Sequence, residues 1–357
     1  MKRIVVALLL LPILCMALSG CDFWMDGQYV SVEPYSEQNF CPEKDMIEVS
    51  SSAQLRQAVV DLVESGARSG IISVASFNDA TVHFYMEGAI RNVTQNNPIG
   101  AYAVDSITYE IGVYSGVDAV ALTIHYRYDG DQVMHIKSAQ TVGEAEDHVY
   151  AALEKFEPSV AVLIQEYQQT DFEYLVQEYA AKNPDIVIEI PRVEANLYPE
   201  KGQQRVVELV FTYQTSRENL RQMQELVAPV FTSAELYVQP DAQLREKYVQ
   251  LYNFLMERFD YSLETTITPA YSLLHEGVGD CTAFATVYAA MCRKAGLECH
   301  VVSGTREGEP WSWNLIYFMG NYFHVDLLFC SQTGGFAASL GSEMTDYEWD
   351  HSAYPSR

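Results

Sequence analysis

The sequence predicts an α+β protein in which two tandem α-β-α-β-β repeat units are followed by a third α+β domain. Three observations lead to this prediction. Apolar residues recur at helical spacing in several segments, short apolar strands follow them, and residues of the front half recur at a constant separation of 86 positions. The chain has 357 residues, of which 48% are hydrophobic and 12% aromatic, so two or three domains with large cores are expected.

The first twenty residues are typical of a secretory signal. Lys2 and Arg3 precede an apolar run from Ile4 to Leu18, which is short for a membrane-spanning helix. The run ends in LSGC, which resembles a bacterial lipobox. That resemblance implies a lipoprotein signal peptide over residues 1–20, acylation (palmitate) of Cys21, and a mature protein anchored to the extracytoplasmic face of the cell membrane. The alternative is an ordinary signal peptide of a secreted protein with a chance cysteine.

Charge argues against several classes of partner. The chain carries 22 Lys and Arg against 48 Asp and Glu, and loss of residues 1–20 would move the net charge from −26 to −28. Such a chain repels nucleic acid and anionic lipid headgroups, so no nucleic-acid partner is expected.

Cysteine and histidine spacing favours no metal site. Beyond Cys15 and Cys21, five cysteines remain, an odd number without a CxxC pair, so neither a disulfide scaffold nor a zinc site is predicted, although one or two disulfides stay open. The histidines of the front half are scattered without ligand spacing. No metal and no cofactor are therefore expected.

Residues 21–49 show no sustained period and are expected to form a tether. The first repeat unit is expected over residues 50–136, where Ser51 and Gln54 form a capping-box pattern at the start of a helix. A strand over residues 70–77, a second helix ending near Asn96, and a hairpin turning near Ser115 and Gly116 complete that unit.

The second repeat unit is expected over residues 137–232. With a separation of 86 residues and no gap, identities fall at predicted helix starts, strand cores and turns. The matched pairs are Ser52 with Ser138, Ala53 with Ala139, Gln54 with Gln140, Ser73 with Ser159, Val74 with Val160, Ala75 with Ala161, Asn97 with Asn183, Pro98 with Pro184, Gly116 with Gly202, and Val120 with Val206.

The third domain is expected over residues 233–357, after a connecting helix near residues 217–231. An amphipathic helix is predicted from apolar residues at spacings of three and four, namely Leu244, Tyr248, Leu251, Tyr252, Leu255 and Phe259. The stretch GVGDC then brings two glycines that permit a tight turn, and Asp280 is placed to cap a helix that begins with Cys281. A thiol at a helix N-terminus is stabilised as thiolate, which favours a nucleophile, whereas a buried cysteine used as a small apolar side chain is the alternative.

The residues after Cys281 resemble the transglutaminase-like branch of the papain-like cysteine protease superfamily. The resemblance covers about residues 240–357 and rests on the motifs GVGDC, AGLECHVVSG, WN and GNYFHVD and on the tail SEMTDYEWDHSAYP, in family order. It implies a strand from Cys299 to Ser303, a hairpin turning at Gly320 and Asn321, a nucleophile at Cys281, and an orienting carboxylate at Asp326.

At the position that the family gives to the catalytic histidine, this chain has Trp311. An indole has one N–H donor and no basic lone pair, so it cannot take the thiol proton. Loss of the base costs on the order of 10⁴- to 10⁶-fold in rate. We expect the Trp311 N–H to donate to the Asp326 carboxylate instead. His324, two residues before Asp326 and expected on the same strand face, is the best substitute base, ahead of His275 and His300.

Three functions remain open from the sequence. In the first, an impaired catalytic domain acts as a pseudoenzyme that binds a peptide, a protein or a peptidoglycan-type ligand in a groove lined by Trp311, Trp313 and Asn314. In the second, the chain is an active cysteine acyl-transfer enzyme that uses Cys281 and Asp326 with a substitute base such as His324. In the third, the repeat units do the work and the last domain is a spacer.

Overall fold

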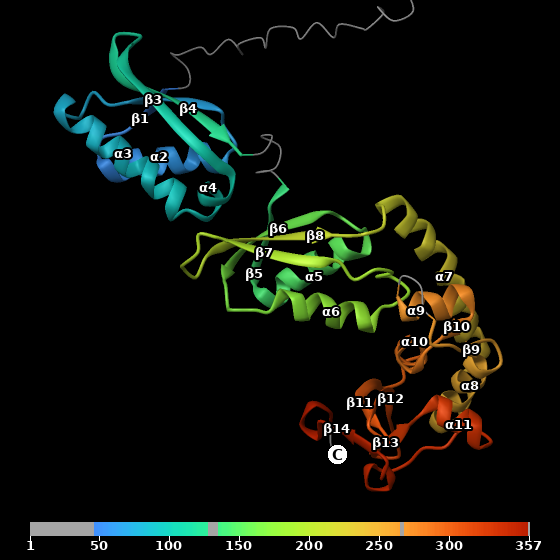
Figure 1. Ribbon diagram of the computed structural model, residues 1–357. Coiled ribbons are helices and arrows are strands. Elements are labelled where there is room, and N and C mark those ends of the chain that lie inside the picture. The colour runs from blue at the N-terminus through green and yellow to red at the C-terminus, as the bar shows by residue number, and fades with distance from the viewer. Residues whose placement is uncertain (1–45, 128–134, 265–267, 356–357) are drawn as a thin grey trace, which may run out of the picture.

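A computed structural model describes residues 46–127, 135–264 and 268–355 of the chain. The expected signal peptide, Cys21 and most of the expected tether lie outside these residues. The described parts follow one another as three bodies, which we call the N-terminal unit (residues 46–127), the middle unit (135–215) and the C-terminal domain (217–355) (Figure 1). Within the described ranges, no helix is both long enough and apolar enough to cross a membrane.

The N-terminal unit is a four-stranded sheet with two long helices on one face. Its sheet has the order β1-β2-β4-β3, in which β1 and β2 are parallel and the other pairs antiparallel. Its elements are β1 (Met46–Glu48), α2 (Ser52–Glu64), β2 (Ser69–Ser73), α3 (Asp79–Gln95), α4 (Pro98–Ala103), β3 (Val104–Tyr114) and β4 (Val117–Tyr126). The apolar faces of α2 and α3 pack on β2 and β4, which explains the helical spacing in the sequence.

Local signals in this unit act as the sequence predicts. The Ser51 hydroxyl accepts from the backbone N–H of Gln54 at 3.3 Å, while the Gln54 side chain accepts from Ser50 rather than from Ser51. The turn between β3 and β4 falls at Ser115 and Gly116, whose φ angles of 51° and 82° suit a tight hairpin. The helix start and the hairpin are therefore confirmed.

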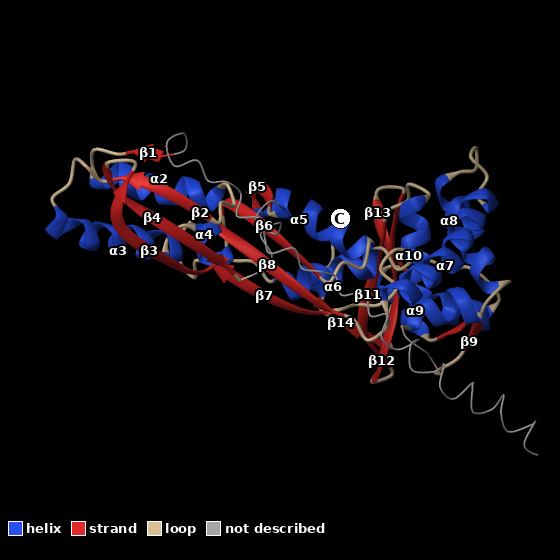
Figure 2. Cartoon of the chain, turned by 90° about the horizontal axis from the view of Figure 1, so that it is seen from above, coloured by secondary structure: helices blue, strands red, loops and turns tan. Residues whose placement is uncertain are grey.

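The middle unit has a sheet of order β5-β6-β8-β7, with β5 and β6 parallel and the other pairs antiparallel. Its elements are β5 (Lys137–Thr141), α5 (Val142–Glu154), β6 (Ser159–Glu166), α6 (Phe172–Lys182), β7 (Arg192–Tyr198) and β8 (Arg205–Thr212). Helices α5 and α6 cover one face of this sheet (Figure 2). On the other face, Tyr102 of α4 packs against Tyr198 with ring centroids 5.4 Å apart, and this contact joins the two units.

The gapless register of 86 residues is wrong. Ser52 is the first residue of helix α2, whereas Ser138 lies in strand β5. Asn97 caps the start of α4, whereas Asn183 ends α6. Most of the matched letters are small or polar residues that suit helix ends, strands and turns alike, so their recurrence does not fix a register. The expected element order also lacked the leading strands β1 and β5, which have three and five residues.

The C-terminal domain packs a helix layer on a four-stranded antiparallel sheet of order β13-β12-β11-β14. Its helices are α7 (Arg217–Tyr237), α8 (Leu244–Met256), α9 (Pro269–Tyr271), η2 (Ser272–Glu276), α10 (Cys281–Lys294), α11 (Leu327–Thr333), η3 (Gly341–Glu343) and η4 (His351–Ala353). Its strands are β9 (Asp260–Tyr261), β10 (Val278–Gly279), β11 (Cys299–Arg306), β12 (Glu309–Phe318), β13 (Asn321–Val325) and β14 (Tyr347–Trp349). The hairpin between β12 and β13 turns at Met319 and Gly320, one residue before the expected place.

Helix α7 belongs to the core of the C-terminal domain. Its buried side chains join the same apolar cluster as α8 and α10. The expected boundary between residues 232 and 233 therefore falls inside one continuous helix of 21 residues. The middle unit is tied to this domain by an ion pair of 2.6 Å between Lys294 of α10 and the largely buried Asp185.

Candidate active site

Cys281 is the first residue of helix α10, which packs on strand β12. The Asp280 carboxylate accepts from the backbone N–H of Ala283 at 2.8 Å, so the expected helix cap is confirmed. The turn before it needs glycine, because Gly277 has a φ of 82° and a Cβ at Gly279 would lie 2.7 Å from the Cβ of Ala283. Short strands β9 and β10 pair in parallel, which places Tyr261 opposite Gly279.

Two polar contacts set the position of α10 against β12. The hydroxyls of Thr282 and Ser312 lie 3.1 Å apart, and the amide of Asn314 donates to the Ala285 carbonyl at 2.8 Å. Asn314 is fully buried. The first turn of α10 is therefore fixed beside Ser312, the neighbour of Trp311.

The Cys281 thiol is shielded from water. The residue is 9% exposed, and this burial raises the pKa of the Cys281 thiol above its ordinary value. A hydrogen bond from the backbone of Ser312 acts in the opposite direction, and the negative charge of Asp280 raises the pKa further. The modest lowering expected from the helix end is thus outweighed, and the thiol form is favoured at neutral pH.

Asp326 accepts hydrogen bonds on both carboxylate oxygens. Its Oδ1 accepts from the backbone N–H groups of Leu328 and Phe329 at 3.1 and 3.0 Å, which caps helix α11. Its Oδ2 accepts from the indole N–H of Trp311 at 2.8 Å and from the hydroxyl of Tyr347 at 2.7 Å. The bond expected between Trp311 and Asp326 is therefore confirmed.

Arg306 adds a positive charge to this group. Its Nη1 lies 3.6 Å from Asp326 Oδ2, and its guanidinium lies over the rings of Trp311 and Phe329 at 5.6 and 4.8 Å. Arg306 and Tyr347 were missed by the sequence reasoning. The only signal that pointed to Tyr347 was its place in the family-like tail, and nothing in the sequence pointed to Arg306.

His324 lies apart from Cys281, in an aromatic cluster behind strand β12. Its Nδ1 accepts from the indole N–H of Trp313 at 2.9 Å, and its ring lies 4.7 Å from that of Trp349. Burial, and then the nearby charge of His351, lowers the pKa of His324 to about 4. Because Nδ1 is already engaged and the ring packs away from Cys281, His324 is badly placed to act as the base for Cys281.

Two of the expected groove residues do not line a groove. Trp313 is 1% exposed and Asn314 is fully buried, so neither side chain offers surface to a ligand in this structure. Trp313 and Asn314 point to opposite faces of β12, and both faces are covered by other parts of the domain. The sequence pattern WN does not reveal this coverage. The other two histidines are no better as bases, because His275 packs on Tyr271 and His300 faces Glu298 at 3.3 Å.

The buried His324 gives stability a defined dependence on pH. In the unfolded chain a histidine takes up its proton near pH 6.5, whereas folded His324 does so near pH 4. Its contribution to stability is therefore complete above about pH 6.5 and falls as the pH drops towards 4, by about 3 kcal/mol. Urea unfolding at pH 7 and pH 4.5 measures this loss.

The matched variant for this measurement is His324→Asn, in which an amide oxygen can accept from Trp313. It should lose less stability than the parent between the two pH values. His125→Asn, at an exposed histidine of strand β4, should not differ from the parent. Equal losses in the parent and in His324→Asn would contradict the assignment.

Comparison with known families agrees with this geometry. A family model described as the transglutaminase-like superfamily matches residues 232–335. These residues form a transglutaminase-like domain. The matched range contains Cys281, Trp311 and Asp326. No curated protein matches the chain.

Solved structures show distant likenesses. A crystal structure of a TGase has 13% identity and a TM-score of 0.27, and the match covers 57% of this chain and 61% of that one. A candidate cysteine protease from Cytophaga hutchinsonii has 13% identity and a TM-score of 0.26, with 44% and 70% covered. A candidate protease from Parabacteroides distasonis has 8% identity and a TM-score of 0.24, with 62% and 36% covered. The chain thus spans less than two thirds of the TGase.

The transglutaminase-like domain offers no cluster of metal ligands in its described residues. Throughout the described parts of the chain, no group of three or more His, Cys, Asp and Glu side chains is arranged to hold a metal ion.

Proposed function

We propose that the transglutaminase-like domain is a pseudoenzyme that binds a peptide, protein or peptidoglycan-type ligand beside Cys281 without efficient acyl transfer. The observation that carries this proposal is the 2.8 Å bond from the Trp311 indole to Asp326. This bond satisfies the carboxylate with a group that has no basic nitrogen, so the side chain at position 311 cannot take the proton of the Cys281 thiol.

Exposed rings around Trp311 and Arg306 support a binding role. Tyr261 is 48% exposed, and its ring centroid lies 6.5 Å from that of Trp311. Phe329 is 40% exposed and lies under the Arg306 guanidinium. Aromatic rings that are held in place and open to solvent gain contact area at little cost in conformational entropy. In this proposal they replace Trp313 as the aromatic contacts to the ligand.

The thiol-alkylation profile of Cys281 tests the loss of catalysis. We expect iodoacetamide to modify Cys281 more slowly than a free cysteine at pH 7, with an apparent pKa above the ordinary value of about 8.5. Mass spectrometry of peptides separates Cys281 from the other three described cysteines, all of which are more deeply buried. Cys281→Ala serves as the blank. An apparent pKa well below that of a free thiol would overturn the pseudoenzyme proposal and favour the active enzyme.

The proposal includes a lipid anchor at Cys21 on the extracytoplasmic face of the cell membrane. Its support is the lipobox-like sequence LSGC after a charged start and an apolar run. Expression in a bacterial host should give a membrane-associated protein that incorporates labelled fatty acid, and Cys21→Ser should abolish the label. A labelled Cys21→Ser protein would count against acylation at this residue.

We further propose that the N-terminal and middle units are two copies of one structural unit. Both sheets begin with a parallel pair and continue with antiparallel pairs in the same chain order. The helix caps Ser51 and Thr141 and the strand starts Ser69 and Ser159 are each separated by 90 residues, which replaces the register of 86. The units would carry the transglutaminase-like domain away from the membrane.

A further inference from the structure

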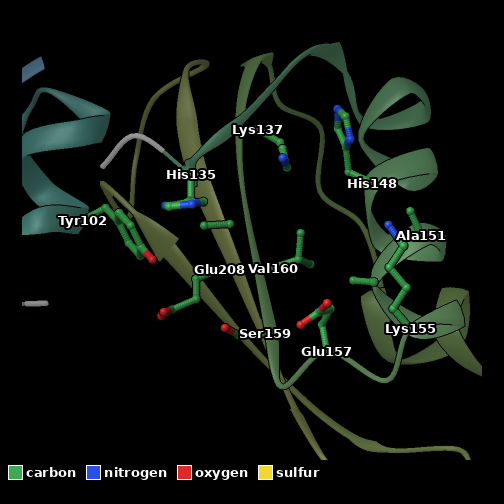
Figure 3. A pocket seen from close by; sticks show the side chains of 12 residues that line it. Tyr102, His135, Lys137, His148, Ala151, Lys155, Glu157, Ser159, Val160 and Glu208 are labelled. Carbon is green, nitrogen blue, oxygen red and sulfur yellow. The ribbon is translucent and has the colours of Figure 1, made fainter. Parts of the chain in front are cut away.

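A cavity of about 580 Å³ lies in the middle unit, far along the chain from Cys281 (Figure 3). Helix α5 forms one wall and the start of strand β6 forms the floor, while Tyr102 of the N-terminal unit closes the opposite side. Its volume is in the range of small-molecule binding sites.

Basic side chains line the wall of the cavity nearest to α5. Lys137, His148 and Lys155 project into it from β5, from α5 and from the residue that ends α5. Among the residues that the structure describes, neither Lys137 nor Lys155 forms an ion pair. Two ammonium groups without an ion-pair partner therefore lie at one cavity of a chain whose net charge is −26.

The carboxylates at the cavity already have partners. Glu157 forms an ion pair of 2.5 Å with Arg217 of helix α7. Glu208 accepts from the amide of Asn196 at 3.3 Å. Arg217 offsets the charge of Glu157, whereas the neutral amide of Asn196 leaves Glu208 charged. The two lysines and Arg217 still exceed the two carboxylates by one positive charge at the cavity.

The wall is held in place by contacts outside the cavity. Arg217 Nε donates to the carbonyl of Lys155 at 2.9 Å, and the next residue, Phe156, is 1% exposed in the core. On the other side, the His148 ring lies 3.4 Å from the carbonyl of Ser138. The backbone that carries Lys155 and the ring of His148 are thus positioned before any ligand arrives, which lowers the entropic cost of binding.

The remaining lining is apolar. Ala151 and Ala152 of α5 line it together with Val160 and Ala161 of β6. Small side chains here leave space for a carbon skeleton, and burial of that skeleton adds affinity that a bare inorganic ion would not gain.

We propose that this cavity binds a small organic anion with two acidic oxygens or groups, carboxylate or phosphate monoester. Its charged groups lie against Lys137 and Lys155, and its carbon skeleton lies over Ala151 and Val160. The net negative charge of the chain repels such a ligand elsewhere, whereas the two ammonium groups attract it to the cavity. This site is independent of the function proposed for Cys281.

Calorimetric titration of the full chain with three probes tests the proposal. Glutarate represents a ligand with two carboxylates, and glycerol 3-phosphate represents a phosphate monoester. Inorganic phosphate carries the charge but has no carbon skeleton. We expect at least one organic probe to bind with a dissociation constant below about 1 mM and inorganic phosphate to bind at least about tenfold more weakly. Preference for glutarate assigns a carboxylate ligand, and preference for glycerol 3-phosphate assigns a phosphate ligand.

Variants separate this site from general charge effects. Lys137→Gln and Lys155→Gln should each weaken the organic probe by about tenfold or more, because each removes a charge-assisted hydrogen bond. Lys201→Gln makes the same change of charge at an exposed position on the β7–β8 hairpin and should leave binding unchanged. Ala151→Phe fills the cavity without changing charge and should abolish binding, with melting temperatures confirming that each variant is folded.

The proposal fails if none of the three probes shows saturable binding, if inorganic phosphate binds as tightly as the organic probes, or if Lys201→Gln weakens binding as much as the two cavity variants do.

Discussion

Replacing Trp311 with histidine is expected to make the Cys281 thiol of the transglutaminase-like domain an active nucleophile. An imidazole at this position has the same acceptor, Asp326, for its N–H, and its second nitrogen is a base for the Cys281 thiol. The base removes the thiol proton, the thiolate attacks an acyl carbon, and the resulting imidazolium returns the proton to the leaving group. We expect the gain over the parent to be on the order of 10²- to 10⁴-fold.

Hydrolysis of 4-nitrophenyl acetate measures this gain, and mass spectrometry detects the acetyl group on Cys281. Trp311→Gln is the matched control, because it shortens the side chain without adding a base. Adding Cys281→Ala to Trp311→His should return the rate to background. A folded Trp311→His protein that is no faster than Trp311→Gln would show that the site lacks more than its base.

Replacing Asp326 with alanine is expected to destabilise the chain more than any other single change at this site, by about 3 to 5 kcal/mol in the free energy of unfolding. The substitution removes the acceptor of the Trp311 and Tyr347 hydrogen bonds and the cap of helix α11. It also leaves Arg306, whose side chain is only 19% exposed, without its carboxylate. Urea unfolding at pH 7 measures the loss.

Trp311→Phe is the graded control for this prediction. It removes one donor to Asp326, while Tyr347 still donates to the same oxygen. We expect a loss of about 1 kcal/mol beyond what the smaller ring explains, since one hydrogen bond is missing and the acceptor stays partly satisfied. A loss for Asp326→Ala that is no larger than that for Trp311→Phe would show that the carboxylate does not hold the site together.

Local signals carried much of the correct prediction. The caps at Ser51 and Asp280 and the hairpin at Ser115 depend on backbone geometry within a few residues, so short patterns reveal them. The bond between Trp311 and Asp326 was also predictable, because the family pattern places the two positions together and the indole has only one polar group.

The errors concern features that depend on distant parts of the chain. Arg306 and Tyr347 meet Asp326 because β14 adds to the edge of β11, and no local period reports that pairing. The burial of Trp313 and the position of His324 likewise follow from the tail that folds behind the sheet. A three-residue strand such as β1 has too few positions for an alternating pattern to be visible.

Helix α7 has a consequence for the modularity of this protein. Its buried residues Leu220, Met223, Val227 and Phe231 all precede residue 233, yet they fill the core around α8 and α10. A fragment that begins at residue 233 would lose these four side chains, worth about 1.5 to 3 kcal/mol each, a sum comparable with the whole stability of an ordinary domain. We therefore expect the transglutaminase-like domain not to fold on its own from residue 233. A stable fragment should begin at or before Arg217.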